Sequence, residues 1–235
     1  MTDRQMTLVE HLDELRGRIL VSLAAVLVVS CLAFWKIRLI MSFLMIRPVD
    51  HLVFFSPTEA FVEYFKLALF VGLTLASPVV LYQLWAFVSA GLKPGERMAF
   101  LIAMPFSVTL FLGGAAFAFF AVIPWSLRFL IDFAGSNVLA MISISKYLSF
   151  VVMMMVMFGV IFELPVAIVL LSKLGLVTPQ FLSRNRKYAI VIIFIAAGVL
   201  TPTPDAFTQI LMAVPLLLLY EISLIICRFT YRKER

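Results

Sequence analysis

Charged side chains are scarce in this sequence. They make up 14% of its 235 residues, whereas a soluble domain carries about a quarter. Cysteine and histidine are also rare, with two of each, and Cys31 and Cys227 lie in apolar segments at opposite ends of the chain, so neither a disulfide framework nor a zinc site is expected. The sequence has no phosphate-binding glycine loop, nucleophile elbow or nucleophile and base pair. These absences argue against a soluble protein and against an enzyme, and we expect no cofactor.

Apolar residues are abundant, at 63% of the chain, and they form long stretches with few or no charges. About 20 apolar residues cross a hydrocarbon core roughly 30 Å thick. We therefore predict an all-α, polytopic membrane protein with one integral membrane domain, residues 1–235, and six spans at about 19–37, 66–92, 98–124, 147–172, 188–203 and 206–226. Seven charges of both signs precede the first stretch and no small-residue cleavage site follows it, so it is predicted to be a span and not a signal peptide.

Positive charges are distributed unevenly between the two sides of this predicted topology. Six spans place both termini on one side, and that side carries 13 of the 19 lysines and arginines against 6 on the other. The positive-inside rule then predicts that both termini lie in the cytoplasm and that the chain is a multi-pass protein of the cell (cytoplasmic or inner) membrane. The net charge of +6 is explained by this orientation, and no nucleic-acid partner is expected.

The apolar segments differ in length. At 1.5 Å per residue the fifth reaches about 25 Å and the third about 45 Å, so the third must tilt or project. We expect the fifth and sixth helices to be short, since they flank a turn with two prolines, residues 201–205, that would thin the bilayer locally. The outer connections, residues 36–66 and 124–146, are expected to form a cap of short helices.

Acidic residues occur on the cytoplasmic side, which the charge rule fills with cations. Thr7 and Glu10 form a capping box, which predicts a helix that runs into the first span. Glu10, Asp13 and Glu14 follow in that segment. A solvated helix end with an ion pair from Glu14 to Arg18 is the simpler interpretation, and a binding site is the alternative.

A second polar group surrounds the tight loop of residues 92–97. The loop contains Glu96, and Gln83, Trp85 and Phe87 precede it. An ordinary turn with interfacial aromatic residues explains this pattern on the residues alone. A binding role for Glu96 is the alternative.

Glu163 lies inside an otherwise apolar span, just before Pro165. A charge there costs at least about 2.5 kcal/mol, so the side chain should face the protein interior, be neutral, or both. Its candidate partners are Gln209 and either Thr201 or Thr203, which flank the outer turn between the last two spans. A functional role is the default for such an acid, against a purely structural hydrogen bond. The alternative function is a proton-coupled small-solute transporter that uses Glu163, although a single acid is a sparse relay and no paired discontinuous helices are evident.

Five motifs occur in an order that resembles the TatC family, the multispanning subunit of the twin-arginine (Tat) protein translocase. They are His11-Leu-Asp-Glu14-Leu-Arg16-Gly-Arg18, Ser77-Pro78-Val-Val-Leu-Tyr82-Gln83-Leu-Trp85-Ala-Phe87, Gly91-Leu-Lys-Pro-Gly-Glu96-Arg97, Phe158-Gly159-Val-Ile-Phe-Glu163-Leu-Pro165, and Leu200-Thr201-Pro202 to Asp205. The resemblance covers nearly the whole chain. It implies a receptor, not an enzyme, that binds the twin-arginine signal peptides of folded proteins at the cytoplasmic face. It also implies assembly with the single-span proteins TatA and TatB, self-association in the receptor complex, and export driven by the proton-motive force.

The resemblance also implies roles for individual residues. Glu14 and Glu96 match the acids that bind the paired arginines, with Phe87 and Arg16 beside them, and carboxylates are suited to two guanidinium groups. Glu163 and Gln209 match an intramembrane polar cluster where the partner helices dock. An additional residue in the outer turn leaves both Thr201 and Thr203 as candidates for the threonine of that cluster, and we favour Thr201.

Overall fold

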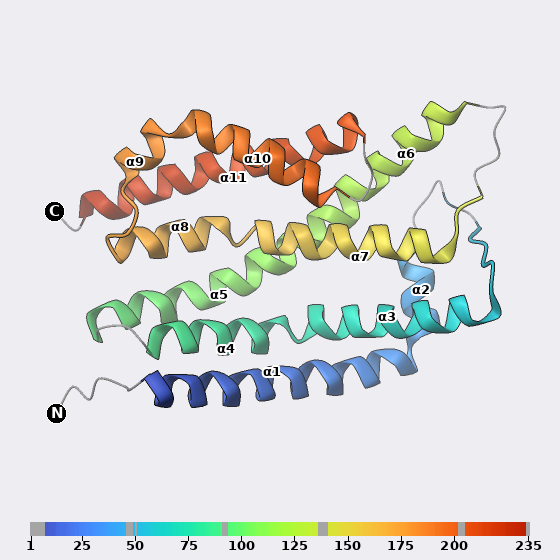
Figure 1. The fold of residues 1–235 in the computed structure, drawn as a ribbon, viewed down its shortest axis with the longest axis horizontal. Coiled ribbons are helices and arrows are strands. Elements are labelled where there is room, and N and C mark those ends of the chain that lie inside the picture. The colour runs from blue at the N-terminus through green and yellow to red at the C-terminus, as the bar shows by residue number, and fades with distance from the viewer. Residues whose placement is uncertain are drawn as a thin grey trace.

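The computed structural model describes residues 8–45, 49, 51–90, 94–135, 141–201 and 205–233, and these residues are mostly helical. The elements are α1 (Leu8–Trp35), α2 (Ile37–Leu44), α3 (Pro57–Leu75), α4 (Ser77–Ala90), α5 (Pro94–Phe117), the π-helical turn η1 (Ala118–Val122), α6 (Ile123–Ala134), α7 (Ile144–Ile161), α8 (Leu164–Lys173), α9 (Pro179–Arg184), α10 (Arg186–Leu200) and α11 (Ala206–Lys233). The predicted all-α architecture is confirmed. The start of α1 and the end of α11 lie at the same end of the bundle (Figure 1).

Helices occupy all six predicted membrane positions. Within the described residues, four stretches are long and apolar enough to span alone: Val9–Trp35, Ile102–Ala134, Ile144–Lys173 and Ala206–Phe229. The second predicted span is a bent pair, α3 and α4, with an angle of 57° between its halves. The fifth is α10, whose 15 residues reach only about 22 Å, short of a hydrocarbon core of roughly 30 Å.

The long third span and the short helices of the connections agree with the sequence-based prediction, whereas the length of the last helix does not. The third span continues through η1 into α6 and crosses the bundle at a slant (Figure 1), as its excess length requires. The outer connections contain α2 and this extension, α6. Only α10 of the last two helices is short, because α11 has 28 residues. It extends past the apolar segment that ends at Cys227 into arginine and lysine, which are good helix formers.

Prolines break two of the spans. Pro78 follows the break between α3 and α4, and Pro165 follows the break between α7 and α8. A proline has no N–H for the carbonyl four residues earlier, and its ring crowds that carbonyl. Glu163 lies at the second break, where its own N–H bonds to the Val160 carbonyl at 3.1 Å. The proline therefore determines where the intramembrane acid departs from regular helix.

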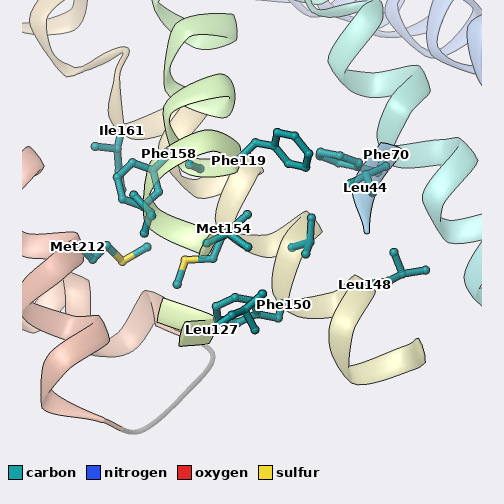
Figure 2. Packing of buried hydrophobic residues seen from close by; sticks show 14 of the residues in the cluster. Leu44, Phe70, Phe119, Leu127, Leu148, Phe150, Met154, Phe158, Ile161 and Met212 are labelled. Atoms are coloured by element: carbon teal, nitrogen blue, oxygen red, sulfur yellow. The ribbon is translucent and has the colours of Figure 1, made fainter. Parts of the chain in front are cut away.

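The core surrounds α7. Tyr147, Val151, Met154 and Phe158 recur every three or four residues along this helix, and all four are buried. Met154 and Phe158 lie close to side chains from other elements, including Met212 of α11 (Figure 2). This spacing places one continuous face of α7 against its neighbours. Helix α7 thus packs mainly against α3, α5 and η1.

Glycines permit two close helix crossings. A side chain at Gly72 of α3 would collide with Ser30 of α1, and one at Gly114 of α5 would collide with the backbone of Phe158 in α7. Lipid is as apolar as leucine, so helix association in a membrane depends on such close packing of small residues. These two crossings fix how α1 lies on α3 and how α5 lies on α7.

Candidate functional site

The first polar group lies near the start of α1 and joins it to α4. The carboxylate oxygen Oε1 of Glu14 accepts hydrogen bonds from Nη2 of Arg18 and, at 3.0 Å, from its Nε. The Nη1 of Arg18 also donates to Oε1 of Gln83 at 3.2 Å. A spacing of four residues places Glu14 and Arg18 on one helix face. The ion pair expected for a solvated helix end is therefore present, and it also contacts a second helix.

An aromatic contact lies beside this ion pair. The ring of His11 stacks on Phe87 of α4, with centroids 4.3 Å apart and planes at 16°. Nδ1 of His11 is 3.9 Å from Oε2 of Glu14. That oxygen is buried and accepts no hydrogen bond from the described residues. We call Glu14, Arg18, His11, Gln83 and Phe87 the Glu14 site.

An apolar groove continues from the Glu14 site toward the middle of α1. It has a volume of about 390 Å³ and lies between α1, the end of α3 and α4. Arg18, Gln83 and Phe87 line its polar end, and residues such as Leu23, Val26, Leu73, Val80 and Leu84 line the rest. The charged Glu14 site and the apolar groove are thus adjacent.

The sequence also predicted Arg16 and Glu96 for this site, and the structure does not place either side chain in it. Arg16 is exposed, and Arg18 is the arginine that contacts Glu14. Glu96 belongs to the first turn of α5, but its side chain lies outside the described part of the chain. The structure brings Glu14 and Phe87 into one site.

The second polar group centres on Glu163, within the fourth span. Its Oε2 accepts a hydrogen bond from the hydroxyl of Ser107 on α5 at 2.5 Å. The Ser107 oxygen in turn accepts a hydrogen bond from Nε1 of Trp85 on α4 at 2.8 Å. The other carboxylate oxygen, Oε1, is buried and has no hydrogen-bond partner among the described residues. We call Glu163, Ser107 and Trp85 the Glu163 site.

The partners predicted for Glu163 form hydrogen bonds elsewhere. Nε2 of Gln209 donates to the carbonyl of Phe194 at 3.0 Å, and Oγ1 of Thr201 donates to the carbonyl of Gly198 at 3.2 Å. Both bonds stay within α10, its turn and α11, where Thr201 caps a helix end that leaves carbonyls unpaired. Among the described residues, neither Thr201 nor Gln209 therefore forms a hydrogen bond with Glu163. Thr203 lies outside the described residues.

Helix α4 lies between the two sites. Gln83 contacts α1 through Arg18, while Trp85, two residues further on, contacts α5 through Ser107. Residues two apart on a helix point in clearly different directions, and residues four apart share a face. Gln83 and Phe87 accordingly both face α1.

Sequence reasoning missed Ser107 and treated Trp85 as an interfacial aromatic residue. The signal that could have found them is a hydroxyl inside the apolar third span, since Ser107 is fully buried. It also missed Glu63, a buried acid near the start of α3. Glu63 accepts hydrogen bonds from Lys66 at 2.7 Å and from Ser145 of α7 at 2.9 Å. This pairing fastens α3 to α7 at the end of the bundle opposite the Glu14 site.

These features define the class of the protein. It is a multi-pass α-helical membrane protein with an acid held by an arginine near one end and a second acid held by neutral donors within a span. A family model described as Sec-independent protein translocase protein (TatC) matches residues 10–215. The chain belongs to the TatC family, a non-enzymatic family of protein translocase components.

Relatives and solved structures match the chain over nearly its full length. TatC of Carboxydothermus hydrogenoformans is 44% identical over 238 residues, which cover 100% of this chain and 98% of the relative. TatC of Aquifex aeolicus is 40% identical, with 98% of each chain covered. The crystal structure of the twin arginine translocase receptor TatC aligns with a TM-score of 0.81 at 40% identity, covering 94% of this chain and 99% of that one. The six-helix membrane fold is thus shared.

Proposed function

We propose that this chain is the receptor and core subunit of a twin-arginine translocase. It binds the twin-arginine signal peptides of folded proteins at the cytoplasmic face and assembles with TatA and TatB for export driven by the proton-motive force. It self-associates in the receptor complex. Family membership supports the translocase role, and the receptor role is that of the similar crystal structure.

The observation that supports the receptor role most strongly is how the two carboxylate oxygens of Glu14 are bonded. One of its oxygens already holds a guanidinium group, and the other is buried without a hydrogen bond from the described residues. A guanidinium group of the signal therefore meets a carboxylate whose surroundings already accommodate this chemistry, and it can bind Oε2 or displace Arg18. Charge-assisted bonds of this kind distinguish arginine from lysine by their fork geometry.

The adjoining groove suits the rest of a signal peptide. Export signals carry an apolar stretch of about 7–15 residues after their cationic segment. The apolar groove begins at Arg18, Gln83 and Phe87, which belong to the Glu14 site. Glu96, which starts the neighbouring helix α5, is proposed as the second acid, and Arg16 as a residue at the margin.

A crosslinking experiment tests the receptor role. Glu14→Lys and Glu96→Lys should each abolish crosslinking of a folded precursor in membranes, while the protein still accumulates. Asp13→Lys is the matched control, because Asp13 is exposed beside Glu14 on α1 and should leave crosslinking intact. The precursor should bind only with its Arg-Arg pair, and a Lys-Lys version should fail. Equal crosslinking of both precursors would refute the proposal.

The Glu163 site is proposed as the docking place for the transmembrane helices of TatA and TatB, together with Thr201 and Gln209. Oε1 of Glu163 offers a buried acceptor to an incoming polar side chain. Glu163→Ala should weaken co-purification with TatA and TatB and leave signal-peptide crosslinking largely unchanged. Unchanged co-purification would remove Glu163 from the docking site.

The cytoplasmic location of both termini is part of the proposal and rests on the charge distribution. It can be tested with single cysteines in a chain in which Cys31 and Cys227 are replaced by alanine. A membrane-impermeant maleimide should label Ser56→Cys in intact cells. It should label Asp13→Cys only after the membrane is permeabilised. The reverse pattern would invert the topology.

A further inference from the structure

A basic surface hollow lies where α9 meets the end of α11, away from both acid sites. Its volume is about 600 Å³, and it is lined by Pro179, Gln180, Ser183, Arg184 and Arg228. The hollow lies at the end of the bundle where α1 begins and α11 ends (Figure 1). Arg228 is next to the last residue of the candidate span Ala206–Phe229, so the hollow lies at the end of that span.

Within the part of the chain that the structure describes, the two arginines of the hollow lack a negative partner. Nη2 of Arg228 donates to Oγ of Ser183 at 3.0 Å, which is a bond to a neutral group. Glu221, which precedes Arg228 by two turns on the same helix, is paired with Arg186 at 2.8 Å. Neither Arg184 nor Arg228 forms an ion pair with a carboxylate in the described residues. An anion that enters the hollow would therefore meet two uncompensated guanidinium groups.

Apolar side chains adjoin the same arginines. Phe181 of α9 is 60% exposed, and on α11 Ile225 and Phe229 are 50% and 73% exposed. Ile225 is three residues before Arg228, so the two share a helix face. A soluble anion would leave these apolar side chains exposed, whereas the acyl chains of a lipid would cover them.

We propose that this hollow binds the headgroup of an anionic phospholipid. Arg184 and Arg228 bind the phosphate, Gln180 and Ser183 supply neutral donors, and the acyl chains lie along Ile225 and Phe229. Arginine suits phosphate because its planar fork gives two parallel bonds. Basic pockets between membrane helices recur as headgroup sites. The inference is independent of signal and partner binding, because it uses none of the residues of the two acid sites.

The test uses the full chain in nanodiscs that contain phosphatidylglycerol and phosphatidylcholine. After extraction, native mass spectrometry counts the lipids retained per protein. The wild type should retain phosphatidylglycerol in preference to phosphatidylcholine. Arg184→Gln and Arg228→Gln should each lower that retention about fivefold, and Arg228→Lys should lower it less. The matched control is Lys187→Gln, which removes one exposed cation of the same surface outside the hollow.

Three outcomes would overturn the proposal. The first is unchanged retention in both glutamine variants when circular dichroism shows native helix content. The second is an equal loss in Lys187→Gln, which would indicate diffuse surface charge. The third is displacement of phosphatidylglycerol by inorganic phosphate at matched phosphorus, which would assign the hollow to a free anion. If Arg228→Gln fails to fold, Arg184→Gln and Ser183→Ala provide the test, since Ser183→Ala keeps both arginines but removes the hydroxyl that orients Arg228 and donates to the headgroup.

Discussion

The two acid sites of this protein stabilise a partly buried carboxylate in different ways. Glu14 is neutralised by Arg18 at the end of a helix, where both side chains keep partial access to solvent. Glu163 lies within a span and is held by the neutral donors Ser107 and, one step behind it, Trp85. A charged partner suits a partly exposed acid near a helix end, whereas neutral donors spare the membrane interior a second charge. The two acids are therefore stabilised by different chemistry: an ion pair at Glu14 and neutral hydrogen bonds at Glu163.

The largest effect expected is that of Gly114→Leu, which should affect the Glu163 site alone. The new side chain would collide with the backbone of Phe158 and push α5, which carries Ser107, away from α7. Overpacking of this kind should cost about 3 kcal/mol of unfolding free energy, measured in mixed micelles titrated with dodecyl sulfate. Gly113→Leu is the control, because nothing lies within 4 Å of a side chain there. Equal losses in both variants would contradict the assigned crossing.

Ser107→Ala should have the next largest effect. It leaves the Oε2 of Glu163 and the indole N–H of Trp85 without the hydroxyl that links them. Buried groups left without a partner should cost about 2 kcal/mol of unfolding free energy in the same assay. Thr109→Ala on the same helix should change little, because that hydroxyl is exposed and bonds to the Phe106 carbonyl of its own helix. A negligible effect of Ser107→Ala would mean that Glu163 is held by other groups.

Trp85→Phe should have a smaller effect than Ser107→Ala. The substitution keeps an aromatic ring but removes the Nε1 donor, so Ser107 loses one hydrogen bond and still donates to Glu163. We expect a loss of about 1 kcal/mol. The double variant with Ser107→Ala should lose less than the sum of the two single variants, because both act on one network. Additive losses would show that Trp85 and Glu163 are uncoupled.

Arg18→Gln should have the smallest effect of the four. The Glu14–Arg18 pair is partly exposed, so we expect a loss of about 0.5 kcal/mol of unfolding free energy. That loss should diminish in 1 M salt, because exposed charges are screened, while the loss from Ser107→Ala should persist. Arg16→Gln is the control, since Arg16 is exposed and is not the partner of Glu14. Equal salt dependence at both sites would remove the contrast between them.

The membrane architecture could be predicted from the sequence because the length of an apolar segment directly limits what crosses a bilayer. This argument placed helices at all six positions and anticipated the short α10 and the projecting third span. It missed the length of α11, since a helix does not end where hydrophobicity ends. The basic tail there continues the same helix.

The candidate sites were less predictable. The cost of a charge in lipid identified Glu163, and acids on a basic face identified Glu14. Their partners depend on how helices far apart in sequence are rotated against each other. Close packing at Gly72 and Gly114 sets that rotation, and a single sequence does not encode it in any periodic pattern. Thr201 and Gln209 were therefore assigned to Glu163, while their hydrogen bonds are made within the α10 and α11 hairpin.

The short α10 has a consequence for how the chain enters the membrane during synthesis. Its 15 residues begin with Arg186 and Lys187, so its apolar part is too short to cross a hydrocarbon core of roughly 30 Å by itself. Helix α11 supplies an apolar surface and, through Gln209, a donor for the Phe194 carbonyl. We therefore expect the insertion machinery to release the last two spans as one hairpin, only after α11 has left the ribosome.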